Sequence, residues 1–538
     1  MISRRRFVHG IAGSALVLGA ARWSATGGAE ARPGAMLSGT QFDLTIDELP
    51  VNFTGARRTA VAINGLVPGP TLRFREGDTV TIRVTNRLRT TTALHWHGLI
   101  VPADMDGVPG VSFTGIAPGA TFEYRFKVNQ SGTYWYHAHA RFQEQVGLYG
   151  SIVIDPRAGE RQVAQREHVL LLSDWTDLDP EHLYRTLKLQ SDYFNLGKRT
   201  AADFVRDARS QGLSAAFTER REWGAMRMQP TDLADVSAYA YTYLINGVTP
   251  AGNWTGTFAK GERVRLRLIN GSSMSIFDVR IPDLKLTVVA ADGQDIEPVT
   301  VDELRIAAAE VFDVLVEPKD DRAYTIFAQS IDRSGYARGT LAPRDGMTAP
   351  IPALDPRPEL AMSDMGHAHH SSAPLSPTVD MRTAMPRTNL DDPGPGLRDN
   401  GRRVLVYSDL HTLGGPIDAR EPGRDLELRV TGHMQRFIWS FDGRKFSEAP
   451  PLRFTYGERL RISLINDTMM THPIHLHGMW SEVEDPSGAF LVRKHTVALQ
   501  PGQQVRYAVT ADALGRWAFH CHLLYHMEAG MFREVHVA

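Results

Sequence analysis

The chain has 538 residues, of which 42% are hydrophobic and 22% are charged, and its formal net charge is −2 at pH 7. At roughly 100–200 residues per domain, this length predicts about three domains rather than one core. The near-zero net charge argues against a general nucleic-acid-binding or anionic-membrane-binding protein, because both functions need a basic surface. A single cysteine, Cys521, excludes an internal disulfide and indicates a thiol kept for chemistry.

Residues 1–31 are predicted to be an export signal. Arginines at residues 4–6 precede a weakly apolar stretch, and Ala29-Glu30-Ala31 is a small-residue cleavage signal. The apolar stretch is shorter than the ~20 residues that cross a bilayer. Paired arginines are typical of twin-arginine signals. We therefore expect the twin-arginine export machinery as a partner, a periplasmic location and no stable membrane insertion; an ordinary secretory signal and an uncleaved anchor are the alternatives.

A repeated pattern divides the rest of the chain. Short alternating strands broken by Gly, Pro and Asn are typical of an all-β sandwich. A glycine followed nine residues later by an asparagine occurs three times, at Gly77 and Asn86, Gly261 and Asn270, and Gly457 and Asn466. Such internal repetition predicts three tandem β-sandwich domains, with boundaries expected at residues 36–160, 161–341 and 403–538.

Two segments depart from the strand pattern. Residues 179–237 are predicted to form a small helical insertion in or before the second domain, beginning at Asp179-Pro180. Residues 342–402 are rich in Pro, Asp, Gly, Ser and Met, which is typical of a loose interdomain linker.

The two outer repeats carry histidine pairs at equivalent positions, whereas the middle repeat has Val279 where a ligand would stand. A His-x-His pair on a strand places both rings on one face. Four pairs that converge would supply eight imidazoles, enough for three metals with a position open for a small ligand. These pairs are His95 and His97, His137 and His139, His475 and His477, and His520 and His522.

A second donor set occurs only in the last repeat. Cys521 lies between His520 and His522, and successive strand side chains point to opposite faces. One thiolate with imidazoles and a thioether is the ligand set of a blue-copper electron-transfer site. A lone buried thiol is the alternative, since free cysteines are commonly inert core residues. The predicted set is His472, Cys521, His526 and Met531.

These four motifs resemble those of the multicopper oxidases over essentially the whole mature chain. Within this family, the sequences of residues 97–110, 241–247 and 513–516 most resemble those of the bacterial copper-resistance protein A group. The resemblance implies three cupredoxin-like Greek-key domains, four copper ions and electron transfer from a substrate to O2. It assigns His472, Cys521, His526 and Met531 to type 1 copper, His95 and His475 to type 2 copper, and two type 3 sites to His97, His137 and His522 and to His139, His477 and His520.

Cys521 is therefore the predicted catalytic point of electron entry to the histidine cluster. Asp106, nine residues after His97, resembles the family's acid near type 2 copper and is predicted to be a proton relay. The alternative for Asp106 is an ordinary turn aspartate. A second acid expected directly after the last type 1 histidine is replaced by Met527.

The electron donor is predicted to be Cu(I) or a small phenol, with O2 reduced to water and a role in copper resistance. Thioethers favour Cu(I), although methionine is also ordinary core filling. Alternatives are a laccase-like phenol oxidase without a role in copper tolerance, a non-catalytic periplasmic copper-binding protein, and a two-domain nitrite-reductase-like enzyme. The candidate Cu(I)-binding residues are Met362, Met365, His367, His369, His370, Met469 and Met470.

Overall fold

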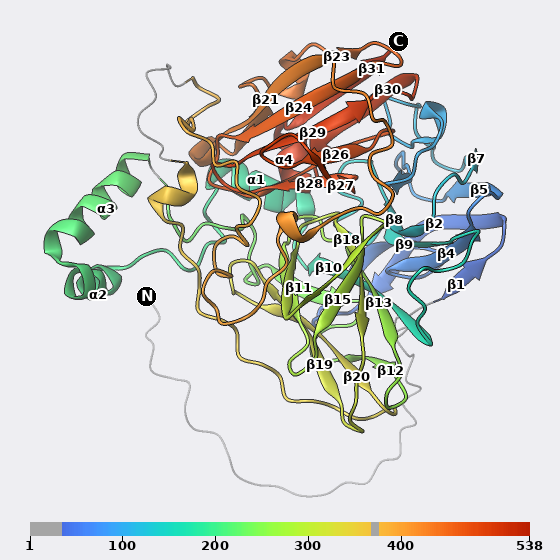
Figure 1. Cartoon of the computed structure of the whole chain (residues 1–538), viewed down its shortest axis with the longest axis horizontal. Helices are drawn as coiled ribbons and strands as arrows, with labels where there is room; N and C mark the ends of the chain where they lie inside the picture. Colours follow the sequence, from blue (N-terminus) through green and yellow to red (C-terminus); the bar gives the residue numbers. More distant parts are fainter. Residues whose placement is uncertain (1–34, 227, 367–375) are drawn as a thin grey trace, which may run out of the picture.

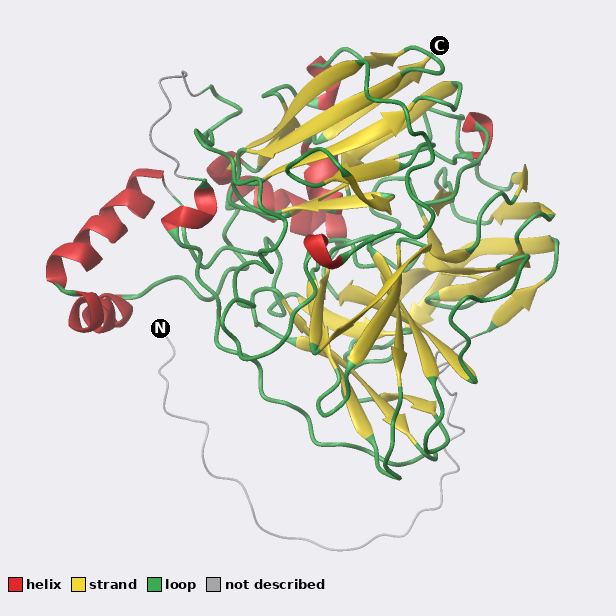
Figure 2. Ribbon diagram, viewed as in Figure 1, coloured by secondary structure: helices red, strands yellow, loops and turns green. Residues whose placement is uncertain are grey.

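A computed structural model describes residues 35–226, 228–366 and 376–538. Six sheets form three two-sheet units (Figure 1, Figure 2), so the prediction of an all-β chain of three sandwiches is confirmed. The predicted export signal lies outside the described residues. Among the described residues, no helix combines the length and the apolar composition that a membrane span requires.

The first unit is built by strands that alternate buried and exposed side chains, as a sandwich requires. In β5, Val80, Ile82 and Val84 are fully buried between the two sheets. The sheets have the orders β1-β4-β9-β8-β6 and β3-β2-β5-β7. The strands are β1 (Met36–Ser38), β2 (Gln41–Val51), β3 (Arg58–Ile63), β4 (Gly69–Arg75), β5 (Thr79–Asn86), β6 (His95–His97), β7 (Thr121–Lys127), β8 (Gly132–His137) and β9 (Tyr149–Asp155).

The second unit follows the same plan and contains the helical insertion. Its sheets have the orders β11-β10-β13-β18-β15-β16 and β12-β20-β19-β14-β17. The strands are β10 (Arg166–Thr176), β11 (Tyr241–Ile245), β12 (Trp254–Thr257), β13 (Val264–Asn270), β14 (Phe277–Arg280), β15 (Leu286–Ala291), β16 (Gln294–Val301), β17 (Glu303–Ile306), β18 (Val311–Val316), β19 (Tyr324–Ser330) and β20 (Tyr336–Ala342).

The third unit has the sheet orders β22-β21-β24-β29-β26-β27 and β23-β31-β30-β25-β28. Its one α-helix, α4 (Leu524–Ala529), lies between β30 and β31. The strands are β21 (Arg424–His433), β22 (Ile438–Phe441), β23 (Leu452–Phe454), β24 (Arg459–Asn466), β25 (His472–Leu476), β26 (Ser481–Glu484), β27 (Phe490–Lys494), β28 (Thr496–Leu499), β29 (Gln504–Thr510), β30 (Gly515–Cys521) and β31 (Phe532–Val537).

The repeated glycine and asparagine have the same structural role in every unit. Each glycine adopts a positive φ, and its N–H donates to a backbone carbonyl one or two residues after the end of a neighbouring strand. Each asparagine closes the loop that leads to the next strand: the Asn86 side chain donates to Thr90 O at 2.9 Å, and the Asn466 side chain donates to Met470 O at 2.7 Å. This closed loop fixes where the following histidine-bearing strand starts in both outer units.

The predicted helical insertion is confirmed between β10 and β11. Helix α1 (Pro180–Leu189) begins at Asp179, whose side chain accepts from the N–H groups of Glu181 and His182, as expected of an N-cap residue. Its Leu183 and Leu187 are buried. Helices α2 (Ala201–Gln211) and α3 (Leu213–Met226) project to one side of the molecule (Figure 1).

The described part of residues 342–402 is packed against the units rather than loose. Leu360, Met365, Met381, Leu390 and Leu397 are all buried. The expectation of a loose linker is therefore wrong for these residues, because their apolar side chains anchor the segment.

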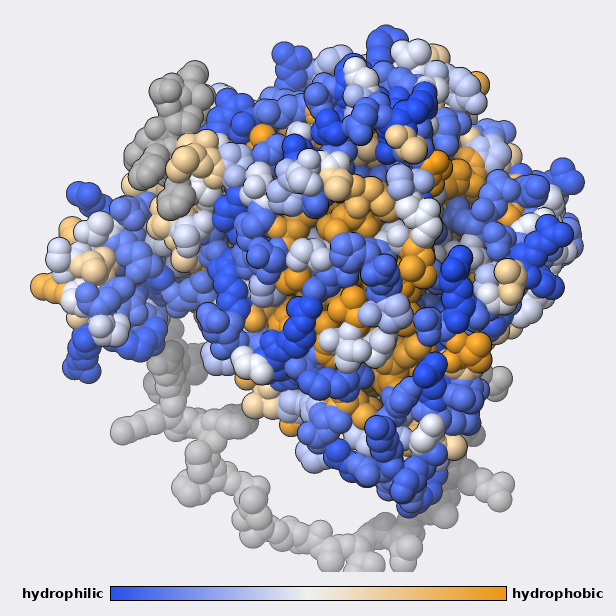
Figure 3. All heavy atoms as spheres, viewed as in Figure 1, coloured by the Kyte–Doolittle hydropathy of each residue, from blue (hydrophilic) through white to orange (hydrophobic). Residues whose placement is uncertain are grey.

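On the face of the molecule shown in Figure 3, hydrophilic residues line the periphery and hydrophobic residues gather near the centre.

Candidate metal centres

Antiparallel pairing brings the histidine pairs together in the same way in both outer units. In the first unit β6 pairs with β8, and His95 lies opposite His137. In the third unit β25 pairs with β30, and His475 lies opposite His520. The sequence repeat therefore corresponds to the same strand pairing in both units, and each unit presents four imidazoles from one pair of neighbouring strands and the residues that directly follow them.

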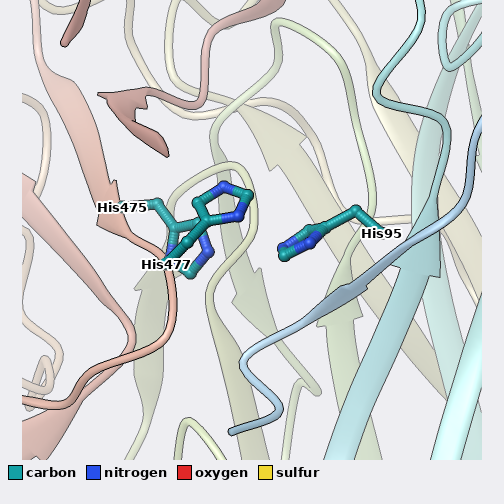
Figure 4. Close-up of side chains that lie close together, drawn as sticks. All are labelled: His95, His475 and His477. Atoms are coloured by element: carbon teal, nitrogen blue, oxygen red, sulfur yellow. The ribbon is translucent and has the colours of Figure 1, made fainter. Parts of the chain in front are cut away.

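The eight predicted histidines then meet across the interface between the first and third units. The Nε2 atoms of His139 and His520 are 3.3 Å apart, and those of His137 and His522 are also 3.3 Å apart. The ring of His95 lies 4.0 Å from that of His477, centroid to centroid. Figure 4 shows His95 facing His475 and His477 from the opposite unit.

The donor atoms fit bound metal better than a hydrogen-bonded core. Backbone carbonyls hold the Nδ1 atoms of His95 and His475, from Asp106 O at 2.8 Å and His495 O at 2.6 Å. Each of these rings then has its Nε2 lone pair left, and neither Nε2 has a partner among the described residues. Fixing one nitrogen so that the other can coordinate is the usual arrangement of metal-bound histidines.

The charge state of the histidine cluster also favours bound metal over a hydrogen-bonded core. Burial and the neighbouring imidazoles hold the pKa values of His97, His137 and His522 well below 6.5. These rings are therefore neutral at pH 7, and neutral imidazole is the form that binds copper. Facing Nε2 lone pairs at 3.1 Å, as between His477 and His520, would repel one another without a cation between them.

Asp106, which the sequence predicts to be an acid near the copper-binding histidines, lies inside the histidine cluster. It is fully buried and follows the short 3-10 helix Ala103–Met105. One carboxylate oxygen is 2.9 Å from Nδ1 of His477 in the third unit, and the other is 3.3 Å from Nδ1 of His95 in the first. The aspartate therefore joins one histidine from each unit.

Two further residues at the cluster were not predicted. Glu144 Oε2 lies 2.6 Å from Nδ1 of His137, and burial raises the pKa of this carboxyl group well above its usual value. His495 Nδ1 is 3.1 Å from Nε2 of His97. Neither residue belongs to a His-x-His pair or to a repeat position, so the sequence carried no signal for their contact with the cluster.

The predicted single-metal set forms a second, separate cluster on the other face of β30. Cys521 Sγ is 3.5 Å from Nδ1 of His472 and 3.9 Å from Nδ1 of His526, and the two Nδ1 atoms are 3.2 Å apart. Met531 is fully buried, and its carbonyl accepts from the Cys521 N–H at 3.1 Å. These donors are the thiolate, imidazole and thioether types that suit copper.

The outward ring nitrogens of this cluster are also held. Thr468 Oγ1 lies 2.7 Å from Nε2 of His472, and Asp235 Oδ2 lies 2.6 Å from Nε2 of His526. Trp439 stacks on the His526 ring at 3.9 Å. Asp235 comes from the segment before β11 in the second unit, and it was not predicted because nothing local in the sequence links it to His526.

The described methionines that were candidate Cu(I) ligands are buried in the hydrophobic core or packed against it. Met365, Met469 and Met470 are at most 2% exposed and belong to the hydrophobic core, and Met362 packs against that core. Core packing accounts for these side chains, and their role as Cu(I) ligands stays a prediction. His367, His369 and His370 lie outside the described residues.

Three β-sandwiches with a histidine cluster between the outer two and a Cys-His-Met set behind it define a copper protein. Family models described as multicopper oxidase match residues 45–159, 166–348 and 419–538. The chain therefore belongs to the multicopper oxidase family and is a copper-dependent oxidoreductase.

Individual relatives agree. The chain is 56% identical to a copper resistance protein A homolog of Pseudomonas syringae pv. tomato and 54% identical to copper resistance protein A of Escherichia coli, each match covering 99% of both chains. It is 31% identical to multicopper oxidase MmcO of Mycobacterium tuberculosis, over 92% of this chain and 86% of that one. Fet3p, a multicopper oxidase that functions in iron import, has a similar fold, with a TM-score of 0.67 at 21% identity over 93% and 90% of the two chains.

Proposed function

We propose that the protein oxidises Cu(I) or small phenols one electron at a time and reduces O2 to water. The observation that carries this proposal is the position of Cys521, whose thiol lies in one donor cluster while its neighbours His520 and His522 lie in the other. An electron can therefore pass between the clusters along a covalent path of one residue.

We further propose four coppers, held as the family resemblance assigns them. When bound, copper at the Cys521 cluster supplies one-electron transfer, and three coppers at the eight histidines supply the four-electron reduction of O2. His472, Cys521, His526 and Met531 would hold the first. His95 and His475 would hold the type 2 ion, and two triads would hold the type 3 pair, His97, His137 and His522 and also His139, His477 and His520.

The chain's own groups have distinct duties in this reaction. His526 is the ligand through which an electron enters, because its Nε2 contacts Asp235 outside the cluster. Asp106 is placed to hand protons to the oxygen-reducing cluster, since its carboxylate contacts both His95 and His477. The buried walls exclude bulk water, which limits escape of partly reduced oxygen.

The cellular part of the proposal is copper resistance in the periplasm. Two relatives more than 50% identical to the chain are named for copper resistance. The paired arginines of residues 1–31 favour twin-arginine export. An exported copper oxidase would convert Cu(I), which is the form that thioethers bind, to Cu(II) outside the cytoplasm.

Oxygen uptake by the copper-loaded protein tests the catalytic proposal. With Cu(I) or 2,6-dimethoxyphenol as donor, uptake should match one O2 per four electrons donated. Cys521→Ser should abolish uptake with both donors while the eight-histidine cluster keeps its copper. Unchanged turnover in this variant would reject the electron route, and copper binding beyond four ions with negligible uptake would favour a non-catalytic copper-binding protein.

A further inference from the structure

The turn between β27 and β28 places His495 beside a histidine of the opposite unit. Nδ1 of His495 lies 3.1 Å from Nε2 of His97, and Oγ1 of Thr496 lies 3.0 Å from the same nitrogen. His495 is 2% exposed and His97 is fully buried. Because both contacts use Nε2 of His97, its Nδ1, which has no partner among the described residues, is the nitrogen left to bind metal.

Asp106 of the first unit holds one histidine of each outer unit. Its carbonyl oxygen lies 2.8 Å from Nδ1 of His95, the first histidine of a pair in its own unit. Its carboxylate lies 2.9 Å from Nδ1 of His477, the second histidine of a pair in the third unit. Both held rings keep Nε2 for metal.

His495 makes the same two kinds of contact from the third unit. Its carbonyl oxygen lies 2.6 Å from Nδ1 of His475, the first histidine of a pair in its own unit. Its side chain reaches His97, the second histidine of a pair in the first unit. Each outer unit therefore sends one side chain to a histidine of the other, and the exchange is reciprocal.

The ring of His495 occupies a space that the chain leaves open beside His97. Gly98 has a φ of +81°, and a Cβ at this position would lie 2.4 Å from Cδ2 of His495. Gly478 is the equivalent residue of the third unit, with a φ of +74°, and a Cβ there would lie 2.5 Å from a ring carbon of Trp517. An indole fills this space in one unit, so space filling alone does not require an imidazole in the other.

We propose that His495 is a positioning residue for the oxygen-reducing cluster, because its Nδ1 accepts a hydrogen bond from Nε2 of His97 and thereby turns Nδ1 of His97 toward copper. Partners that hold the second nitrogen of a metal-bound imidazole fix its tautomer and its orientation. His495 is thus the counterpart of Asp106 from the opposite unit. This inference rests on the proposed binding of copper by the eight histidines.

Two substitutions separate hydrogen bonding from packing. His495→Phe keeps a ring in the space and removes both nitrogens, whereas His495→Asn removes the ring and keeps an amide oxygen near the position of Nδ1. We expect His495→Phe to weaken copper retention at the histidine cluster about 10–100-fold, measured by titration of the copper-loaded protein with a chelator. The loss in His495→Asn should stay below about tenfold, and His411→Phe, which changes an exposed histidine, should retain copper like the wild type.

Spectra of the loaded variants show which copper is affected. In His495→Phe, copper held by His97 should become visible by electron paramagnetic resonance, because a displaced ion no longer couples magnetically to its neighbour. The blue band of the Cys521 centre should persist in both variants, since that cluster lies on the other face of β30. Thermal unfolding of the copper-free proteins checks that they are folded, and His495→Gln, whose amide extends past the Nδ1 position, replaces His495→Phe if the latter does not fold.

Any ranking other than a larger copper loss in His495→Phe than in His495→Asn would overturn the proposal. In particular, copper kept by the phenylalanine variant and lost by the asparagine variant would show that the ring only fills space. Chelator titration needs no turnover, so it decides the role of His495 separately from the proposed function. A wild-type protein that used no O2 with either donor would reject that function alone.

Discussion

The single carboxylate of Asp106 contacts copper-binding histidines of two different units. It contacts His95 of the first unit and His477 of the third, and it has no exposure to solvent. A carboxylate in this position can align both rings and can also accept and release a proton. General acid–base groups typically contribute 10²–10⁴-fold to a rate.

Replacing Asp106 with asparagine should therefore slow oxygen reduction by about 10²-fold. The asparagine keeps hydrogen bonding to the rings but cannot carry a proton. Reduction of the Cys521 centre by a phenol, followed as bleaching of its blue band without O2, should keep its wild-type rate. The exposed neighbour change Asp104→Asn is the control. Equal slowing of both half-reactions would show that Asp106 only supports the fold.

At the scale of the strand, the second unit acts on the histidine cluster although it contributes no imidazole to it. Its Asp292 accepts from the N–H groups of His495 and Thr496, both at 3.1 Å. Lys494, at the end of β27, lies 3.3 Å from Asp292 and 2.8 Å from Glu310, and it is fully buried. These contacts fix the turn between β27 and β28, where His495 meets His97.

Lys494→Met should consequently destabilise the protein by about 3–5 kcal/mol, because two buried carboxylates lose their cation. Thermal unfolding of the copper-loaded protein measures the effect. Lys285→Met, which breaks the exposed ion pair with Asp302, should cost at most about 1 kcal/mol. Similar losses in the two variants would mean that the buried charges do not hold the units together.

The elements that could be predicted are those whose pattern is local. Strand alternation, the repeated glycine and asparagine, and the His-x-His spacing all lie within a few residues, so the sandwiches and the histidine strands followed from them. Glu144, Asp235 and Asp292 could not be predicted in the same way. Asp235 and Asp292 meet their histidines only through packing between segments distant in the chain. Glu144 lies seven residues after His137, but an isolated acidic residue at that spacing forms no periodic pattern.

At the scale of the whole molecule, the histidine cluster couples the association of the outer units to copper and to pH. Burial depresses the pKa values of seven of its imidazoles, and that of His520 falls to about 4; the seven are His97, His137, His139, His475, His477, His520 and His522. A histidine whose pKa is lower in the folded chain contributes stability above the unfolded value of 6.5 and loses it as pH falls. Copper should bind the converged rings more tightly than the separated histidines of the unfolded chain, so loading should raise the unfolding temperature.

The copper-free protein should therefore unfold more easily at pH 5.5 than at pH 7.5. Each shifted imidazole contributes up to about 1.4 kcal/mol per pH unit below 6.5. The raised pKa values of buried carboxyls, such as about 7 for Asp235, act in the opposite direction, so the histidines must be isolated by comparison. A copper-free double variant, His137→Gln with His139→Gln, removes two shifted imidazoles. Denaturant unfolding at both pH values should show a shallower pH slope for this variant, because glutamine takes up no proton in the unfolded chain. An identical slope would mean that these two rings have the same pKa in the folded and the unfolded chain.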